Sequence, residues 1–123
     1  MIGNNPVSSP DGKRIVYQQD RAGDELWDLY AVPSDGGKTI NLTNTPAIRE
    51  ENPHWSHDGR TIAFAYKPKG DSQYDIALLD WNTRKVQKLT HEQQPGYSWS
   101  VVAWSTDDKT ICAGRMNPPS TDV

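Results

Sequence analysis

A nine-residue pattern that joins a turn to a β-strand occurs three times in this chain of 123 residues. Its copies read Ser-Pro-Asp-Gly-Lys-Arg-Ile-Val-Tyr at residues 9–17, Ser-His-Asp-Gly-Arg-Thr-Ile-Ala-Phe at 56–64 and Ser-Thr-Asp-Asp-Lys-Thr-Ile-Cys-Ala at 105–113. The copies begin at residues 9, 56 and 105 and are therefore 47 and 49 residues apart. Such a period is typical of solenoids and propellers, in which each unit buries its apolar face against the next. The repeat therefore constrains the architecture more than the function.

The composition fits thin β-layers that share burial with their neighbours. Only 34% of the residues are hydrophobic and the mean hydropathy is −0.82, which is low for one compact core. The net charge is −3 and the 13 Lys and Arg residues are scattered, whereas a nucleic-acid surface needs concentrated basic residues to displace phosphate counterions. We therefore expect no nucleic-acid partner. Because no apolar run is long enough to span a bilayer, we also expect no membrane insertion.

The compartment does not follow from the residues. Residues 1–6 lack the charged and apolar zones of an export signal, so we expect any such signal to lie outside these residues. Cys112 is the single cysteine and cannot form an internal disulfide. We expect it to be a small, buried, apolar residue on a strand.

Short β-rich runs alternate with turn-forming residues in each unit, which predicts an antiparallel meander. We predict four strands per unit. The first strands are expected at 6–9, 54–56 and 101–105, the second at 14–18, 61–66 and 110–115, the third at 27–32 and 74–80, and the fourth at 39–43 and 86–90. The predicted fold is all-β: a single domain over 1–123 that forms a partial β-propeller, with four-stranded antiparallel blades at 6–43 and 53–90 and a half blade at 101–116.

The turn between the first and second strands has the residues of a tight structural turn. In the first copy Pro10 presets φ, Asp11 can cap turn amides and Gly12 can take a positive φ. One aspartate per turn does not supply the alternating oxygen ligands of a calcium loop. Asp28 and Asp75 open the third strands at the same interval, and we expect them to accept hydrogen bonds from the adjoining loops rather than to act as catalytic acids.

The full set of repeated residues resembles a known blade. The pattern Trp55-Ser56-x-Asp58-Gly59, the strand at 62–64, Asp75-Ile76 and Leu89-Thr90 is similar to the repeat of TolB-like six-bladed β-propellers. It also resembles the propeller domain of the prolyl oligopeptidase family of serine peptidases. The likeness covers about residues 5–116 and does not separate the two groups. This chain departs from the pattern in a few positions: Ser8 stands for the tryptophan, His57 and Thr106 for the turn proline, and Asp108 for the turn glycine.

The predicted blades form only part of a ring. The pattern begins on a first strand and stops on a second strand, so strand edges with unpaired N–H and C=O groups are expected at both ends. Either missing sequence or oligomerisation of several copies would complete such an object. We favour a fragment of a longer protein, and we expect the isolated chain to self-associate through its open blade edges.

Candidate binding residues lie on the face formed by the longer loops, at 19–25, 67–73, 44–52 and 91–100. Tyr97 and Trp99 are candidate anchors, because aromatic side chains bury much area with few rotatable bonds; packing between blades is the alternative. The loop at 44–52, which joins the fourth strand of the first blade to the first strand of the second blade, carries Arg49, Glu50 and Glu51. Some dipeptidyl peptidases of the similar family hold a substrate amino terminus with a propeller glutamate pair, but the local context does not establish that correspondence, and solvated loop charges are the other interpretation.

Catalysis, cofactors and metals have no support in the residues. No Gly-x-Ser-x-Gly elbow, phosphate-binding glycine loop or nucleophile arrangement occurs. None of the three histidines has a partner at ligand spacing. We therefore expect no catalytic residue, no metal and no cofactor in this chain.

Two functions are in competition. The first is a non-catalytic TolB-like propeller module that binds a protein or peptide. The alternative is the propeller part of a prolyl oligopeptidase or dipeptidyl peptidase-like enzyme, which gates substrate access to a separate hydrolase domain. A sugar-binding role is a third interpretation, based only on the loop aromatics. A TolB-like protein would be periplasmic or extracytoplasmic, and a cytoplasmic location is open as well.

Overall fold

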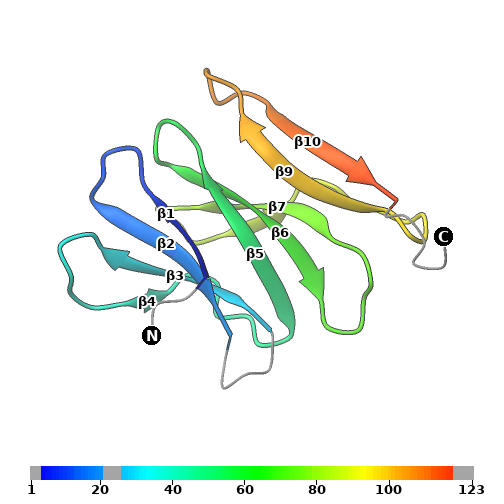
Figure 1. Ribbon diagram of the computed structural model, residues 1–123, viewed down its shortest axis with the longest axis horizontal. Coiled ribbons are helices and arrows are strands. Elements are labelled where there is room, and N and C mark those ends of the chain that lie inside the picture. The colour runs from blue at the N-terminus through cyan, green and yellow to red at the C-terminus, as the bar shows by residue number, and fades with distance from the viewer. Residues whose placement is uncertain (1–3, 21–25, 118–123) are drawn as a thin grey trace.

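The chain folds into a partial β-propeller, described by a computed structural model over residues 4–20 and 26–117. The described residues form three antiparallel sheets and no helix (Figure 1). Sheet 1 contains β1 (Asn4–Ser8), β2 (Arg14–Gln19), β3 (Asp28–Pro33) and β4 (Ile40–Asn41); sheet 2 contains β5 (Ile48–Trp55), β6 (Thr61–Pro68), β7 (Asp75–Asp80) and β8 (Val86–Lys88); sheet 3 contains β9 (Ser98–Trp104) and β10 (Ile111–Met116). The all-β partial propeller predicted from the sequence is confirmed.

The three sheets are meanders that stand side by side. Strands β1, β5 and β9 open the sheets and contact one another in that order. The tight β5–β6 and β9–β10 turns lie at the top of Figure 1, and the β6–β7 and β8–β9 loops lie below and to the right. Tight turns and longer loops therefore occupy opposite ends of the sheets.

The first turn of each sheet is closed by the repeated serine and aspartate. Ser9 Oγ donates to Asp11 Oδ1 at 2.6 Å, and the Lys13 amide donates to the same oxygen at 2.9 Å. The second and third turns repeat both bonds. These bonds lower the pKa of Asp11, with the serine hydroxyl as the largest cause. The aspartates of this motif thus cap the turns, as predicted.

The apolar core lies between sheets 1 and 2. Its buried residues come from β2, β3 and the residue after β4 in sheet 1 and from β6 and β7 in sheet 2: Val16, Leu29, Ala31, Leu42, Ile62, Phe64, Ala77 and Leu79. Trp55 and Trp81 are half-buried and pack against this cluster. Sharing one core between two thin sheets explains how a chain with so few hydrophobic residues stays folded.

Trp55 and Trp104 make equivalent hydrogen bonds. The Trp55 indole N–H donates to the Val7 carbonyl at 3.3 Å, and the Trp104 indole N–H donates to the His54 carbonyl at 3.0 Å. Each tryptophan therefore links the first strand of its sheet to the first strand of the preceding sheet. Both side chains are half-buried, and a buried indole N–H usually finds a hydrogen-bond partner of this kind.

Some expectations from the sequence were wrong: β9 begins at Ser98 rather than at Val101. Strand β5 begins at Ile48 rather than at His54, because a bulge at Asn52, with φ of 55°, lets pairing continue past Pro53. Cys112 is exposed rather than buried, since β10 pairs only with β9 among the described residues. No helix in the described part of the chain could cross a membrane.

Candidate binding face

Glu50 is a fully buried carboxyl at the junction of sheets 1 and 2. It lies on β5, and its amide donates to the Trp27 carbonyl at 2.7 Å. Thr43 Oγ1 donates to Glu50 Oε1 at 2.9 Å and Thr45 Oγ1 donates to Oε2 at 2.6 Å. The expectation of a loop-face binding residue or a solvated charge was wrong for Glu50, which has 0% of its surface exposed.

A second buried carboxyl, that of Asp28, lies beside the same threonines. Asn41 Nδ2 donates to Asp28 Oδ2 at 3.0 Å, and the Thr45 amide donates to Oδ1 at 3.3 Å. Burial raises the pKa of Glu50 to about 8, and the Asp28 carboxyl adds to that rise although the threonine hydroxyls oppose it. Glu50 therefore keeps a proton at neutral pH and links the two sheets, where no substrate can reach it.

Glu51 belongs to a different cluster. Its side chain accepts a short hydrogen bond from the Tyr74 hydroxyl, and Arg49 Nε lies 3.1 Å from Glu51 Oε2. Burial, followed by the hydrogen bond to Glu51, raises the pKa of Tyr74. Since adjacent strand residues point to opposite faces of a sheet, Glu50 and Glu51 do not converge on one ligand group.

Tyr97 and Trp99 lie at the start of sheet 3. Trp99 is on β9, and its amide donates to the Tyr74 carbonyl at 2.9 Å. Its side chain lines a hollow of about 470 Å³ between sheets 2 and 3, together with Ile76 and Leu89. Tyr97 is half-buried beneath the Arg115 guanidinium, whose carbon lies 4.1 Å from the ring centroid. Trp99 therefore faces the space between sheets 2 and 3, and Tyr97 lies at the end of the sheets that carries the longer loops.

Arg115 is fixed over Tyr97 by an acidic partner. Its Nε lies 2.5 Å from Glu92 Oε1 and its Nη2 donates to Oε2 at 3.0 Å. The hydrogen bonds from Arg115 are the largest cause that lowers the pKa of Glu92 to about 2. This end of sheet 3 thus presents an ion pair and an aromatic ring.

The first strands of the sheets form a surface that the sequence analysis missed. Two adjoining hollows, of about 300 and 430 Å³, are lined by β1, β5 and β9 residues that include Val7, Pro53 and His54. At one end Asn5 Nδ2 donates to Asn52 Oδ1 at 2.7 Å. The signal was present, because the dipeptide Asn-Pro occurs at 5–6 and 52–53, one repeat apart. We call these two hollows the inner-strand surface.

The inner-strand surface offers binding chemistry rather than reaction chemistry. It combines the Asn5 and Asn52 amides and the His54 imidazole with apolar area from Val7 and Val102, and Val102 is 58% exposed. No group of three acidic, histidine or cysteine side chains that could hold a metal ion occurs among the described residues. A surface of this composition can accept the backbone and side chains of a peptide.

By fold the chain is a partial propeller, and curated proteins with similar sequences are propeller proteins of two kinds. Tol-Pal system protein TolB of Francisella tularensis subsp. mediasiatica is 29% identical over 91 residues, which is 71% of this chain and 20% of that protein. Uncharacterized peptidase YuxL of Bacillus subtilis is 27% identical over 111 residues, 87% of this chain and 16% of that protein. The chain therefore spans about a fifth or less of these relatives. No family model matches it.

Solved structures show the same two likenesses. TolB from Acinetobacter baumannii matches with a TM-score of 0.61 and 26% identity, over 97% of this chain and 33% of that one. A puromycin hydrolase matches with a TM-score of 0.65 and 14% identity, over 91% of this chain and 20% of that one, a likeness of fold alone. The resemblance to TolB-like propellers and to peptidase-family propeller domains is confirmed.

Proposed function

We propose that this chain is a non-catalytic propeller unit that binds a protein or peptide through the inner-strand surface and the neighbouring loop ends. The observation that carries the proposal is the exposed apolar and amide lining shared by β1, β5 and β9. Side chains from three sheets meet there, so a ligand can contact all of them at once. The similarity to TolB, whose name places it in the Tol-Pal system, supports a role in protein assembly.

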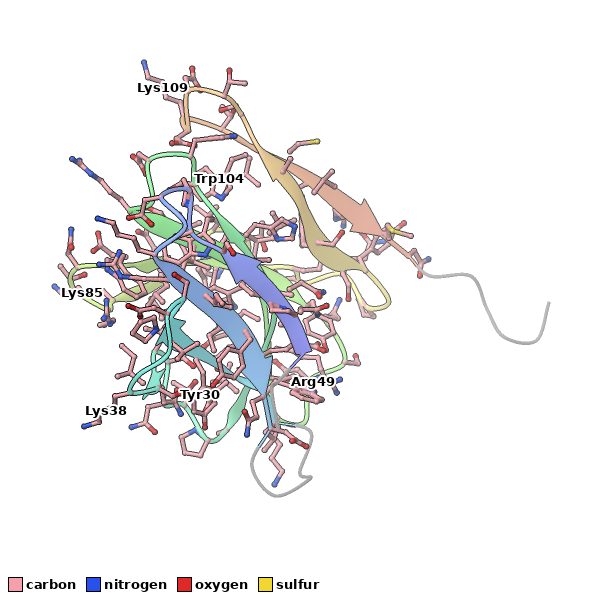
Figure 2. The ribbon with its side chains drawn as sticks, turned by 60° about the vertical axis from the view of Figure 1, so that its left-hand side comes forward. Tyr30, Lys38, Arg49, Lys85, Trp104 and Lys109 are labelled. Atoms are coloured by element: carbon pink, nitrogen blue, oxygen red, sulfur yellow. The ribbon has the colours of Figure 1, made fainter. Side chains whose placement is uncertain are left out.

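Four residues predicted from the sequence remain part of this proposal. Arg49 and Glu51 are partly exposed, with 30% and 16% of their side-chain surfaces accessible, and Tyr97 and Trp99 are half-buried. Arg49 lies away from the turn end of the molecule in Figure 2. We place these residues at the rim of the binding face, and we leave the buried Glu50 out.

A random dodecapeptide phage library selected on the purified chain tests this role. Enriched peptides are then rebound to Val102→Asp and to Lys109→Ala, whose side chain projects from the distant β9–β10 turn (Figure 2). We expect some enriched peptides to lose binding to Val102→Asp, because it places a charge in the apolar lining, and to keep binding to Lys109→Ala. The absence of any peptide with this behaviour contradicts the proposal.

The second candidate function is that of the propeller part of a peptidase, supported by the likeness to YuxL and by the fold of puromycin hydrolase. In it, the propeller filters substrates for a hydrolase domain encoded further along the same gene. Sequencing the gene beyond the codon for Val123 decides between the two functions. A downstream Gly-x-Ser-x-Gly elbow selects the peptidase, and an open reading frame that ends without such an elbow excludes it.

Self-association is a separate proposal that rests on the outer face of sheet 1. Ile15 and Tyr17 alternate with the core residue Val16, so they point away from sheet 2. They line a hollow of about 670 Å³ with Val32 and Pro33, in which Tyr17 is already covered by its stacking on Tyr30 and Ile15 is half-buried. Burying such a face is what neighbouring blades do in propellers. We expect sedimentation equilibrium at micromolar concentration to give a mass above that of one chain; a stable monomer contradicts this.

A further inference from the structure

Trp81 lies between two sheets at the turn end of the molecule. It follows β7, and its amide donates to the Arg60 carbonyl at 2.8 Å. The indole packs against the core cluster, and its centroid lies 5.4 Å from that of Trp55, with the rings tilted by 47°. The ring is thus held rigidly, with part of it at the surface.

Two guanidinium groups lie against this indole. The Arg14 carbon Cζ lies 4.6 Å from the ring centroid and the Arg84 Cζ lies 4.2 Å from it. Both distances are within the range in which a cation is attracted to an aromatic face. A positively charged side chain from sheet 1 and another from the β7–β8 turn therefore meet at this indole.

Arg84 adopts a backbone conformation that side chains rarely adopt. Its φ is 64°, whereas the residue one repeat earlier, Gly37, has φ of 131°. Positive φ suits glycine and is strained for arginine. The β7–β8 turn holds Arg84 there through Asp80, which accepts hydrogen bonds from the Asn82 and Thr83 amides at 2.9 Å. Strain of this kind is often found where a side chain is needed for binding.

An apolar groove adjoins the cations. It has a volume of about 110 Å³, with Ala31, Pro33 and Ile40 on the face of sheet 1 towards Trp81, and Arg14 and Lys38 also line it. Ile40 is 38% exposed and lies on β4, which pairs only with β3 among the described residues. Lys38 and Lys85 project on the same side in Figure 2, away from Arg49. We call this site, together with Arg84, the Trp81 groove.

The cations of the Trp81 groove lack carboxylate partners. Over the described ranges, 4–20 and 26–117, no acidic oxygen lies within 4.0 Å of the charged nitrogens of Arg14, Lys38 or Arg84. The turn carboxylates Asp11 and Asp80 accept hydrogen bonds from the amides of their own turns, and Asp11 also interacts electrostatically with Arg14. Asp35 is an exposed carboxylate in the β3–β4 turn, and none of these carboxylates forms an ion pair with Arg14, Lys38 or Arg84 among the described residues.

We propose that the Trp81 groove binds an acidic peptide segment of a partner protein that carries an aliphatic or aromatic side chain. The apolar side chain lies on Pro33 and Ile40, and the flanking carboxylates pair with Arg14, Lys38 and Arg84. A peptide fits better than a nucleic acid, because the floor is aliphatic and the guanidiniums already lie against the Trp81 ring, which leaves little aromatic surface for a base. The site lies at the turn end and is independent of the inner-strand surface.

Fluorescence anisotropy with a labelled octapeptide of alternating glutamate and leucine tests this site. We expect saturable binding with a dissociation constant below about 1 mM at low salt, weakening as salt screens the charges. Arg84→Gly removes the cation and relieves the strained φ, as at Gly37, and is expected to weaken binding by about tenfold or more. Lys109→Ala removes the same charge from a distant turn and should leave binding unchanged.

A second variant separates the groove from the charge. Ile40→Asp keeps all three cations but places a carboxylate on the apolar floor, so binding should be lost, while Val102→Asp should bind normally. Circular dichroism and thermal melts establish that each variant is folded. The proposal is overturned if the acidic peptide shows no saturable binding, if Arg84→Gly and Lys109→Ala weaken it equally, or if a lysine–leucine octapeptide or a uridine oligonucleotide binds as tightly.

Discussion

The interface between sheets 1 and 2 and the interface between sheets 2 and 3 use the same backbone contacts with different side chains. The amide of Glu50 donates to the Trp27 carbonyl, and that of Trp99 donates to the Tyr74 carbonyl in the same way. One junction therefore holds a buried carboxyl where the other holds an indole. The repeat specifies how the strands meet, and the side chain at that point decides whether the junction responds to pH.

The surroundings of the two repeated aspartates differ in the same manner. Asn41 donates to Asp28 at 3.0 Å, whereas Lys88 Nζ lies 3.2 Å from Asp75 at the equivalent place. The Asp28 carboxyl contributes to the raised pKa of the neighbouring Glu50. A lysine neutralises Asp75 directly. The first junction is thus a closed polar network, and the second is more open to solvent.

The largest expected effect tests whether the first junction carries the stability. Phe64→Ala removes a fully buried core ring and should lower the free energy of unfolding by about 3–5 kcal/mol. Ile111→Ala at the second junction should cost clearly less, because Ile111 is only half-buried. Urea denaturation followed by fluorescence measures both; equal losses would contradict the comparison.

The pH dependence of stability should also differ between the junctions. Glu50 has a pKa of about 8 in the folded chain and 4.5 as a free side chain, so the folded state holds a proton that the unfolded state releases. Its contribution to stability is complete below pH 4.5 and is lost as the pH rises towards about 8. Glu50→Gln should flatten this decline in thermal melts.

Glu92 provides the control of opposite sign. Its pKa is lowered to about 2, so its contribution is present above the unfolded pKa and is lost as the pH falls. Glu92→Gln should therefore leave the alkaline decline unchanged and reduce the acid sensitivity. An alkaline decline of the same size in Glu50→Gln and in the parent chain would show that Glu50 is not protonated.

A smaller effect is expected from the contact between the turns of sheets 2 and 3. Asp108 Oδ1 accepts from the His57 amide at 2.8 Å and Oδ2 accepts from the Asp58 amide at 2.9 Å. Desolvation acts against ionisation, but these bonds and the His57 ring lower the pKa of Asp108. Asp108→Asn should lower the melting temperature less than Phe64→Ala does, because it weakens only the contact between the turns of sheets 2 and 3. Asp108→Gly, which also relieves φ of 61°, should lose less than Asp108→Asn.

The smallest effect is expected at Cys112. Because it is exposed, a thiol reagent should label it in the folded chain at a rate near that of a free thiol, and Cys112→Ser should change stability by less than about 0.5 kcal/mol. Labelling that occurs only after denaturation would show that the cysteine is covered, for example by a second copy.

Local patterns predicted the meander, the turns and the role of the repeated aspartates, because these depend on residues close together in the sequence. The Thr45 and Glu92 amides do donate to Asp28 and Asp75. Residues 44–52 were predicted to form a loop, whereas β5 begins at Ile48, so the strand position of Glu50 was missed.

The sites that were missed depend on contacts between distant residues. Trp81 meets Arg14 from another sheet, and no spacing along the chain indicates that pairing. The inner-strand surface likewise needs three sheets in place before its lining exists. The sequence contained its repeated Asn-Pro dipeptide but not the direction in which those side chains point.

The tryptophan links between first strands have a direction along the chain. Trp55 bonds to a carbonyl 48 residues earlier, and Trp104 bonds to one 50 residues earlier. During synthesis, each acceptor is therefore available before the indole that needs it. The sheets can dock one after another from the amino-terminal side as the chain emerges from the ribosome, without waiting for residues still to be translated.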